Sequence, residues 1–279
     1  MITFLAHFSP WEQGGDHNFI QVQFSETHPY RSKKEKEMNT YRKTAIIVGV
    51  LFLLGFAGVF GPVIVKPILD DPSYLVKILE NKNQVLVGAL FQLIMAYACA
   101  GIAIGLYPIL KKYNESLALG AVGFRIIENV FAIVTALGLL LLVTLSQESV
   151  KADALAASTF QTIGALLLAV RFWAGLVLSQ FGWGLGALMY YYVFYRTKLI
   201  PRWLSGWGLV AIILHLASVF VTMFTQIDPF SGSATILMNI PAGLQELTLA
   251  VWLIVKGFNP SAIASLSAKT ATNELLSVA

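Results

Sequence analysis

The chain has 279 residues, of which 57% are hydrophobic and 12% charged, and its formal net charge is +4. A soluble domain normally carries about 25% charged residues, and a single core cannot bury so many apolar side chains, so this composition excludes a soluble globular fold. The basic residues stand in short clusters at the ends of long apolar blocks, where membrane orientation signals belong, and they do not indicate a nucleic-acid partner.

Residues 1–37 are unlike the rest of the chain, because they are polar and contain no apolar run that could serve as a signal peptide. Met38 begins a stretch typical of the start of a membrane protein, with basic residues just before the first apolar block. Lys34-Glu35 can be encoded AAG-GAG, the core of a ribosome-binding site. Two interpretations therefore stand: a native cytoplasmic tail, or a native start at Met38. Other codons at residues 34–35 would remove the support for the second.

Six apolar blocks follow, each long enough to cross the hydrocarbon core of a bilayer, which takes roughly 20 residues. The predicted spans cover residues 44–66, 84–110, 115–146, a part of 158–197, 203–226 and 235–257. The fourth block is over-long, so residues 155–170 form either an interfacial helix or a part of that span. The sequence thus predicts an all-α integral membrane protein, with a six-helix transmembrane domain over residues 38–260 and a short cytoplasmic tail over 261–279.

Orientation follows from the distribution of lysine and arginine. Outside residues 1–37, nine of them fall on the predicted side of the N-terminus and four on the opposite side. Because lysine and arginine accumulate in cytoplasmic loops, we expect a protein of the cell (plasma) membrane with both ends in the cytoplasm. Aromatic residues near the predicted inner boundary are interpreted as interfacial anchors, namely Tyr190, Tyr191, Tyr192, Tyr195 and Trp203.

Four ionisable residues lie deep inside the predicted spans: Arg125, Glu128, His215 and Glu246. At about 1.5 Å per residue, each is roughly 15–18 Å from the inner end of its helix, close to the midplane of the bilayer. Charged groups at this depth are costly and normally face the interior of the bundle, where they find partners. We therefore predict a midplane polar cluster in which Glu246 lies near Arg125.

Polar and small residues share the helix faces that carry these groups. The supporting polar residues are Asn129, Arg171, Ser218 and Asn239, with Arg171 nearer the outer side. Gly182 and Gly186 fit the small-xxx-small pattern, which lets transmembrane helices approach closely. The sequence therefore predicts that four stripes of small and polar residues face one another.

The cluster leaves more than one role open. It either fixes the register of the helices in a structural, assembly or regulatory protein, or it serves a small-molecule or proton-coupled transporter or ligand-binding bundle. No pattern of an intramembrane protease or of a nucleotide-binding loop occurs, so no catalytic residue, metal site or cofactor is predicted, and Cys99 is the single cysteine. The expected partners are the lipid bilayer and a small-molecule or proton ligand; the sequence gives no oligomeric state.

Several sequence blocks resemble one known family. They are Gly123 to Glu128, Leu185 to Arg196, Leu199 to Gly206 and Leu244 to Gly257. In these blocks the chain, over about residues 38–265, resembles a prokaryotic family of multi-pass membrane proteins described as domain of unknown function 4386. The resemblance implies a bacterial or archaeal membrane protein and supplies no activity, substrate or cofactor.

Overall fold

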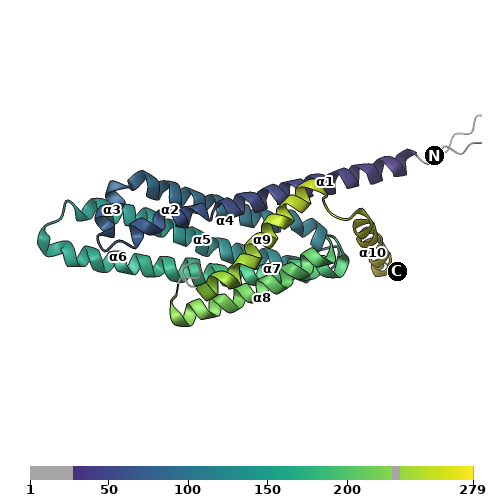
Figure 1. Ribbon diagram of the computed structural model, residues 1–279. Coiled ribbons are helices and arrows are strands. Elements are labelled where there is room, and N and C mark those ends of the chain that lie inside the picture. Colours follow the sequence, from purple (N-terminus) through teal and green to yellow (C-terminus); the bar gives the residue numbers. More distant parts are fainter. Residues whose placement is uncertain (1–27, 228–232, 279) are drawn as a thin grey trace, which may run out of the picture. The chain divides into compact units, whose positions relative to one another are not determined.

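The computed structural model describes residues 28–227 and 233–278, and within them every regular element is a helix. The chain divides into two compact units, residues 1–37 and 38–279, and the second is described below. The helices, labelled in Figure 1, are α1 (His28–Ala57), α2 (Phe60–Leu69), α3 (Tyr74–Glu80), α4 (Lys82–Leu110), α5 (Glu115–Ser149), η1 (Ala154–Ala156), α6 (Ala157–Phe172), η2 (Trp173–Leu178), α7 (Ser179–Thr197), α8 (Arg202–Thr225), α9 (Ser233–Val255) and α10 (Pro260–Val278).

Six helical stretches are long and apolar enough to cross a membrane: Met38–Leu69, Lys82–Leu110, Glu115–Ser149, Ala157–Thr197, Arg202–Thr225 and Thr235–Val255. Each corresponds to one predicted span, with ends that differ by a few residues. The all-α, six-span class predicted from the sequence is therefore confirmed, while the side on which each end lies stays a prediction.

The first span is broken in the middle. α1 ends at Ala57 and α2 begins at Phe60, with a turn over residues 58–59. Pro62 explains the break, because a proline cannot donate to the carbonyl four residues earlier, here that of Gly58, and its ring clashes with that carbonyl. A continuous helix over residues 44–66 was predicted, and the structure corrects it to two helices.

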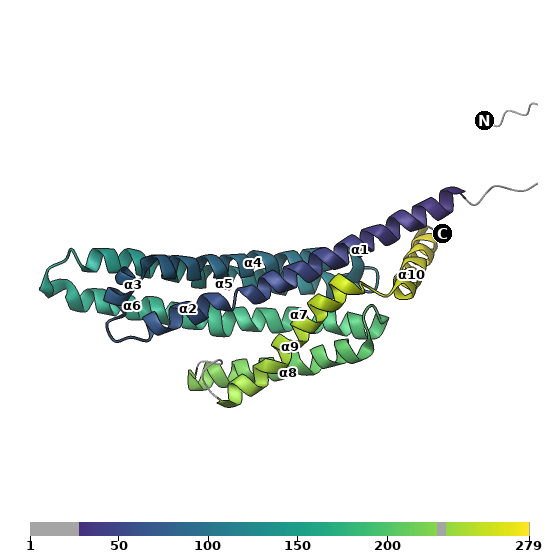
Figure 2. The ribbon, with the colours of Figure 1, turned by 45° about the horizontal axis from the view of Figure 1, so that its top comes forward.

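Residues 157–172 are not a separate interfacial helix. α6 continues into the π-helical segment η2 and then into α7, so that Ala157–Thr197 forms one helical stretch of 41 residues. At about 1.5 Å per residue it is roughly 60 Å long, about twice the thickness of the hydrocarbon core. Both views show α6 and the neighbouring part of α5 extending past the end of α8 and the start of α9 (Figures 1 and 2).

This extension has a hydrophobic core of its own, called the second core below. Its buried residues come from α2, α3, α4 and the last turns of α5, and include Val65, Ile78, Val85 and Leu142. The Ser146 hydroxyl donates a hydrogen bond to the Leu75 carbonyl and ties α3 to α5. The short helix α3 was not predicted, because its seven residues are too few to stand out as an apolar block.

At the ends of the spans away from this extension, polar side chains and α10 hold the helices together. The guanidinium of Arg42 on α1 donates to the carbonyls of Leu253, at 3.1 Å, and Ile254, at 2.6 Å, in the last turn of α9. It supplies the donors that the end of a helix lacks. Lys112, in the turn after α4, donates to the Tyr41 hydroxyl and, at 2.9 Å, to Ser267 of α10.

α5 lies at the centre of the packing, in contact with α3, α4, α6, η2 and α7, while α8 and α9 form a hairpin beside α7 (Figure 2). α5 and α7 approach each other closely at Gly182. A methyl group placed there would lie 2.8 Å from the backbone nitrogen and 2.9 Å from the Cα of Glu128. The missing side chain therefore allows the two backbones to touch at the point where α5 carries its charged residues.

Candidate functional site

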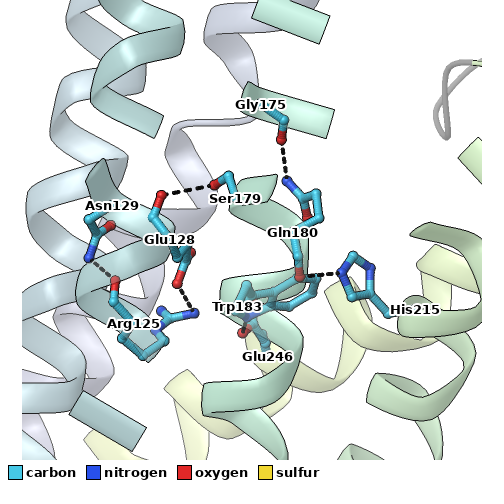
Figure 3. A network of polar contacts seen from close by, with 9 residues as sticks. All are labelled: Arg125, Glu128, Asn129, Gly175, Ser179, Gln180, Trp183, His215 and Glu246. Atoms are coloured by element: carbon cyan, nitrogen blue, oxygen red, sulfur yellow. Dashed lines mark hydrogen bonds and ion pairs between the residues drawn. The ribbon is translucent and has the colours of Figure 1, made fainter. Parts of the chain in front are cut away.

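α5 carries three of the predicted residues on one buried face. Arg125 is 1% exposed, and its Nη1 lies 3.0 Å from Oε2 of Glu128, one turn later. The Asn129 side-chain amide donates to the Arg125 carbonyl at 2.6 Å. The spacing i, i+3, i+4 that predicted a common face thus places an ion pair and an amide side by side in the interior (Figure 3).

α7 is shaped to receive this face. Gly182 leaves room for the backbone of Glu128, and a methyl group at Gly186 would lie 3.0 Å from Cγ of Arg125. The Ser179 hydroxyl donates to the Glu128 carbonyl at 3.1 Å. The small residues of the predicted α7 stripe therefore serve the charged pair directly, by letting its side chains and backbone lie against α7.

The π-helical segment η2 ends at this same place. The Ser179 N–H reaches back to the carbonyl of Ala174, five residues earlier. The Gln180 side chain donates to the Gly175 carbonyl at 3.2 Å and so satisfies a group near the widened turn (Figure 3). π-helical turns inside α-helices are frequently found at functional sites. A π-helical turn contains one residue more than an α-helical turn, and here this extra residue sets the register of the helix face that begins at Ser179.

α9 contributes the second carboxylate. Oε1 of Glu246 accepts a hydrogen bond from the Trp183 indole N–H at 3.1 Å. Glu246 also interacts electrostatically with Arg125 and Glu128, although the direct ion pair of Arg125 is with Glu128. Trp183 on α7 thus holds the carboxylate of α9 by a hydrogen bond between the two helices.

α8 contributes His215, which is held between α7 and α9. Its Nδ1 lies 2.7 Å from Oδ1 of Asn239, and its ring meets the Trp183 ring edge-on at 4.2 Å between centroids. The Ser218 hydroxyl donates to the His215 carbonyl at 2.7 Å and also contacts Asn239. The indole of Trp183 therefore contacts both the imidazole of His215 and the carboxylate of Glu246.

The structure brings seven of the eight predicted residues into this polar network and leaves one out. Arg171 donates instead to the Thr135 carbonyl, toward the far end of α5, and its alkyl chain lies beside Gly138. Arg171 lies eight residues before Ser179, which is about 12 Å along the helix, and this distance explains why it does not meet the network. Arg171 is a half-buried cation with a carbonyl partner and lies apart from the network.

Two tyrosines interpreted as interfacial anchors are buried. Tyr190 and Tyr191 are 0% exposed, whereas Tyr192, Tyr195 and Trp203 are exposed. Successive residues of a helix point about 100° apart, so three adjacent tyrosines cannot all face lipid. The Tyr191 hydroxyl donates to the side-chain oxygen of Gln245, whose amide in turn donates to the Leu204 carbonyl at 3.2 Å.

Comparison with known proteins identifies the family. Residues 47–257 match the family described as "Domain of unknown function (DUF4386)". The chain belongs to the DUF4386 family. The family resemblance stated from the sequence is therefore confirmed, and the matched range contains every residue of the polar network. No curated protein and no solved structure matches the chain.

The charges of this DUF4386 protein do not balance at the network. One guanidinium, that of Arg125, is shared by two carboxylates: it forms an ion pair with Glu128 and interacts electrostatically with Glu246, which lies beyond ion-pair distance. Several buried polar atoms nearby have no hydrogen-bond partner in the described residues: Arg125 Nε and Nη1, Glu128 Oε2, Asn129 Oδ1 and Tyr190 Oη. Arg125 Nη1 and Glu128 Oε2 are close enough for an ion pair but poorly aligned for a hydrogen bond. Buried polar atoms normally find partners, so water molecules, a proton or a polar ligand fit this interior.

Two members of the network were missed from the sequence. Trp183 and Gln180 are not ionisable, so a search for charges at membrane depth passes over them. They directly follow Ser179 and Gly182 in the chain, so they point about 100° away from the small-residue face of α7, and the stripe pattern does not find them either. Among the described residues, no group of three or more histidine, cysteine or acidic side chains could hold a metal ion.

Proposed function

We propose that this member of the DUF4386 family is a multi-pass protein of the prokaryotic cell membrane with a structural, assembly or regulatory role. In this proposal the polar network fixes how α5, α7, α8 and α9 pack. The observation that carries it is that the four ionisable groups are held by protein partners, namely Glu128 for Arg125, Trp183 for Glu246 and Asn239 for His215. The pair of Arg125 and Glu128 lies within α5, whereas the other two contacts join different helices and so specify one packing arrangement.

The orientation proposed has both termini in the cytoplasm. It is supported by the excess of lysine and arginine at the ends of the spans that carry residues 42–43, 111–112, 196–202 and 256. A reporter protein that fluoresces only after folding in the cytoplasm, fused to the C-terminus, should be fluorescent. A dark fusion at normal expression would contradict the orientation.

Replacing Glu246 with glutamine tests the structural role. The amide oxygen can still accept from the Trp183 N–H, but the negative charge that faces Arg125 is lost. Because hydrogen bonds and ion pairs of buried charged groups are the stronger ones, we expect Glu246→Gln to lower the free energy of unfolding by about 1–3 kcal/mol. Unfolding of the purified protein in mixed micelles measures this.

The matched control is Glu148→Gln, in an exposed pair with Lys151 at the end of α5. Exposed pairs contribute about 0–1 kcal/mol, so this variant should unfold almost like the unaltered protein. Equal stability of Glu246→Gln and Glu148→Gln would contradict a structural role for the buried carboxylate.

A second candidate function is proton-coupled transport or binding of a small polar ligand through the network. Two observations favour it: two carboxylates share one guanidinium, so that one bound proton would make the trio neutral, and unpartnered polar atoms surround Arg125. Buried charges in membrane proteins often mark proton or ligand pathways.

Proton flux distinguishes the two candidates. Proteoliposomes that hold a trapped pH-sensitive dye are given a membrane potential, and the internal pH is followed. The structural proposal expects the same flux as in protein-free liposomes. Flux above that level that is abolished in Glu246→Gln at unchanged folded yield would instead establish the proton pathway and overturn the purely structural role.

A further inference from the structure

A basic pocket lies at the end of the spans, away from the polar network. It is formed by the loop from α7 to α8 and the loop from α9 to α10, and its volume is about 580 Å³. The two loops are joined by the Asn259 N–H, which donates to the Leu199 carbonyl at 2.8 Å, and by the Asn259 side-chain amide, which donates to the Lys198 carbonyl at 3.3 Å. The pocket is therefore a built feature in which two distant loops are held together.

Three cations line this pocket and no acidic residue does. Lys198, Arg202 and Lys256 belong to its walls, and all three are exposed. The ion pairs among the described residues are made by other side chains. Within residues 28–227 and 233–278, the charged group of Arg202 has its one polar or ring contact with Tyr195, at 5.6 Å from the ring centroid, and no acidic partner compensates its charge. The pocket thus gathers three positive charges without an anion.

Two other cations at the same end of the spans bond to groups of the protein itself. Arg42 holds the last carbonyls of α9, and Lys112 bonds Tyr41 and Ser267. These contacts account for the positions of those two side chains in the folded protein. Packing gives no similar account of Lys198, Arg202 and Lys256, whose side-chain nitrogens donate to no hydrogen-bond acceptor among the described residues.

The backbone of α8 adds to the positive potential. This helix of 24 residues begins at Arg202, and no side chain caps its first turn. The first helical N–H groups have no partner within the helix and carry the positive end of the helix dipole, which favours anions and phosphate groups in particular. They add to the charges of the three side chains at the wall that contains Arg202.

The surroundings of the pocket are those of a membrane interface. Trp252 lines it, and Trp203 stands beside Trp252 at 6.3 Å between ring centroids. Trp203 and Val255, which flank two of the cations in the chain, are 57% and 61% exposed. Tryptophan is enriched at the headgroup level, and exposed apolar side chains next to it suit acyl chains. The ligand should therefore carry both an anionic group and apolar chains.

We propose that this pocket binds the phosphate group of an anionic phospholipid, with Lys198, Arg202 and Lys256 around the phosphate and the acyl chains against α8 and α9. Basic pockets between transmembrane helices are suited to anionic headgroups. The inference does not depend on the role of the polar network, because the pocket shares no side chain with it.

The test is the binding of phosphatidylglycerol to the full-length protein in detergent, followed by native mass spectrometry, with phosphatidylcholine as the zwitterionic comparison. Each cation near a membrane surface contributes about fivefold in affinity, so the double variant Lys198→Gln/Lys256→Gln should bind phosphatidylglycerol about 25-fold more weakly. The control is Lys43→Gln/Lys111→Gln, which removes two exposed cations from the same end of the spans outside the pocket.

Support for the proposal is preferential binding of phosphatidylglycerol that falls in the pocket variant and stays unchanged in the control. Equal weakening in both variants would mean that surface charge in general attracts the lipid and would overturn the site. A third outcome is that inorganic phosphate or glycerol phosphate displaces the lipid at comparable concentration. The pocket would then bind a soluble phosphate compound, and the proposal of a lipid site would be overturned.

Discussion

Replacing Arg125 with methionine is expected to lower the free energy of unfolding by about 3–5 kcal/mol, the loss typical of removing one partner from a buried ion pair. The guanidinium is 1% exposed and is the cation that faces both Glu128 and Glu246. Methionine fills a similar volume, so the loss comes from leaving two carboxylates without their counter-charge. Unfolding in mixed micelles, together with the yield of monodisperse protein, measures the effect.

Two further variants separate this effect from a general loss of charge. Arg196→Met removes an exposed guanidinium that contacts only the Tyr192 side chain, and we expect a change within about 0.5 kcal/mol. Adding Glu128→Gln to Arg125→Met removes one of the two carboxylates left without a counter-charge. The double variant should recover much of the lost free energy of unfolding. If Arg125→Met were as stable as Arg196→Met, the guanidinium would not be holding the network together.

Replacing Gly182 with alanine is the second change with a large expected effect. The added methyl group would lie 2.8 Å and 2.9 Å from backbone atoms of Glu128, and a backbone cannot turn aside as a flexible side chain can. α5 and α7 must separate, which weakens the hydrogen bond from Ser179 to the Glu128 carbonyl. Overpacking of this kind typically costs about 1–3 kcal/mol, measured as a lower midpoint of thermal unfolding in detergent.

Gly123 on α5 offers the matched control. A methyl group there would meet nothing within 4 Å. Alanine is favoured over glycine in a helix by about 1 kcal/mol at either position, so the difference between the two variants isolates the packing against α7. We expect Gly123→Ala to be neutral or stabilising. A Gly182→Ala variant as stable as Gly123→Ala would mean that the two helices do not touch at Glu128.

The polar network also shows which features of this fold a sequence can predict. The depth predicted for Arg125, Glu128, His215 and Glu246 rests on counting residues along each helix, since the rise per residue is fixed, and it stays a prediction. The common face of Arg125 and Glu128 follows from helical periodicity. Both inferences need only local geometry, and the same holds for the six spans, whose lengths are set by the thickness of the bilayer.

Pairings between helices have no comparable local signal. Nothing in the residues around Glu246 indicates that its hydrogen-bond donor is Trp183, 63 positions earlier. The burial of Tyr190 and Tyr191 depends on which neighbours α7 meets, and the aromatic pattern of an interface looks the same in the sequence. The π-helical turn before Ser179 shifts the register of α7 by one residue, which a count at the ordinary rise cannot anticipate.

The second core explains why the fourth predicted span was over-long. That stretch, from α6 to α7, continues together with α5 past the end of α8 and the start of α9, where α2 and α3 cover them (Figures 1 and 2). Their apolar residues therefore have two different surroundings along one helix, the bundle and this extension. Hydropathy alone does not distinguish the two, whereas the break caused by Pro62 could have been predicted from proline chemistry.

The most direct measurement is the coupling free energy between Arg125 and Glu246, from the unfolding of the unaltered protein, Arg125→Met, Glu246→Gln and the double variant in one alkaline detergent solution. A shared interior predicts a coupling of about 1–3 kcal/mol, with the double variant more stable than the sum of the two losses implies. Losses that add to within about 0.5 kcal/mol would show that the two side chains act independently, and would contradict a single network joining α5 to α9.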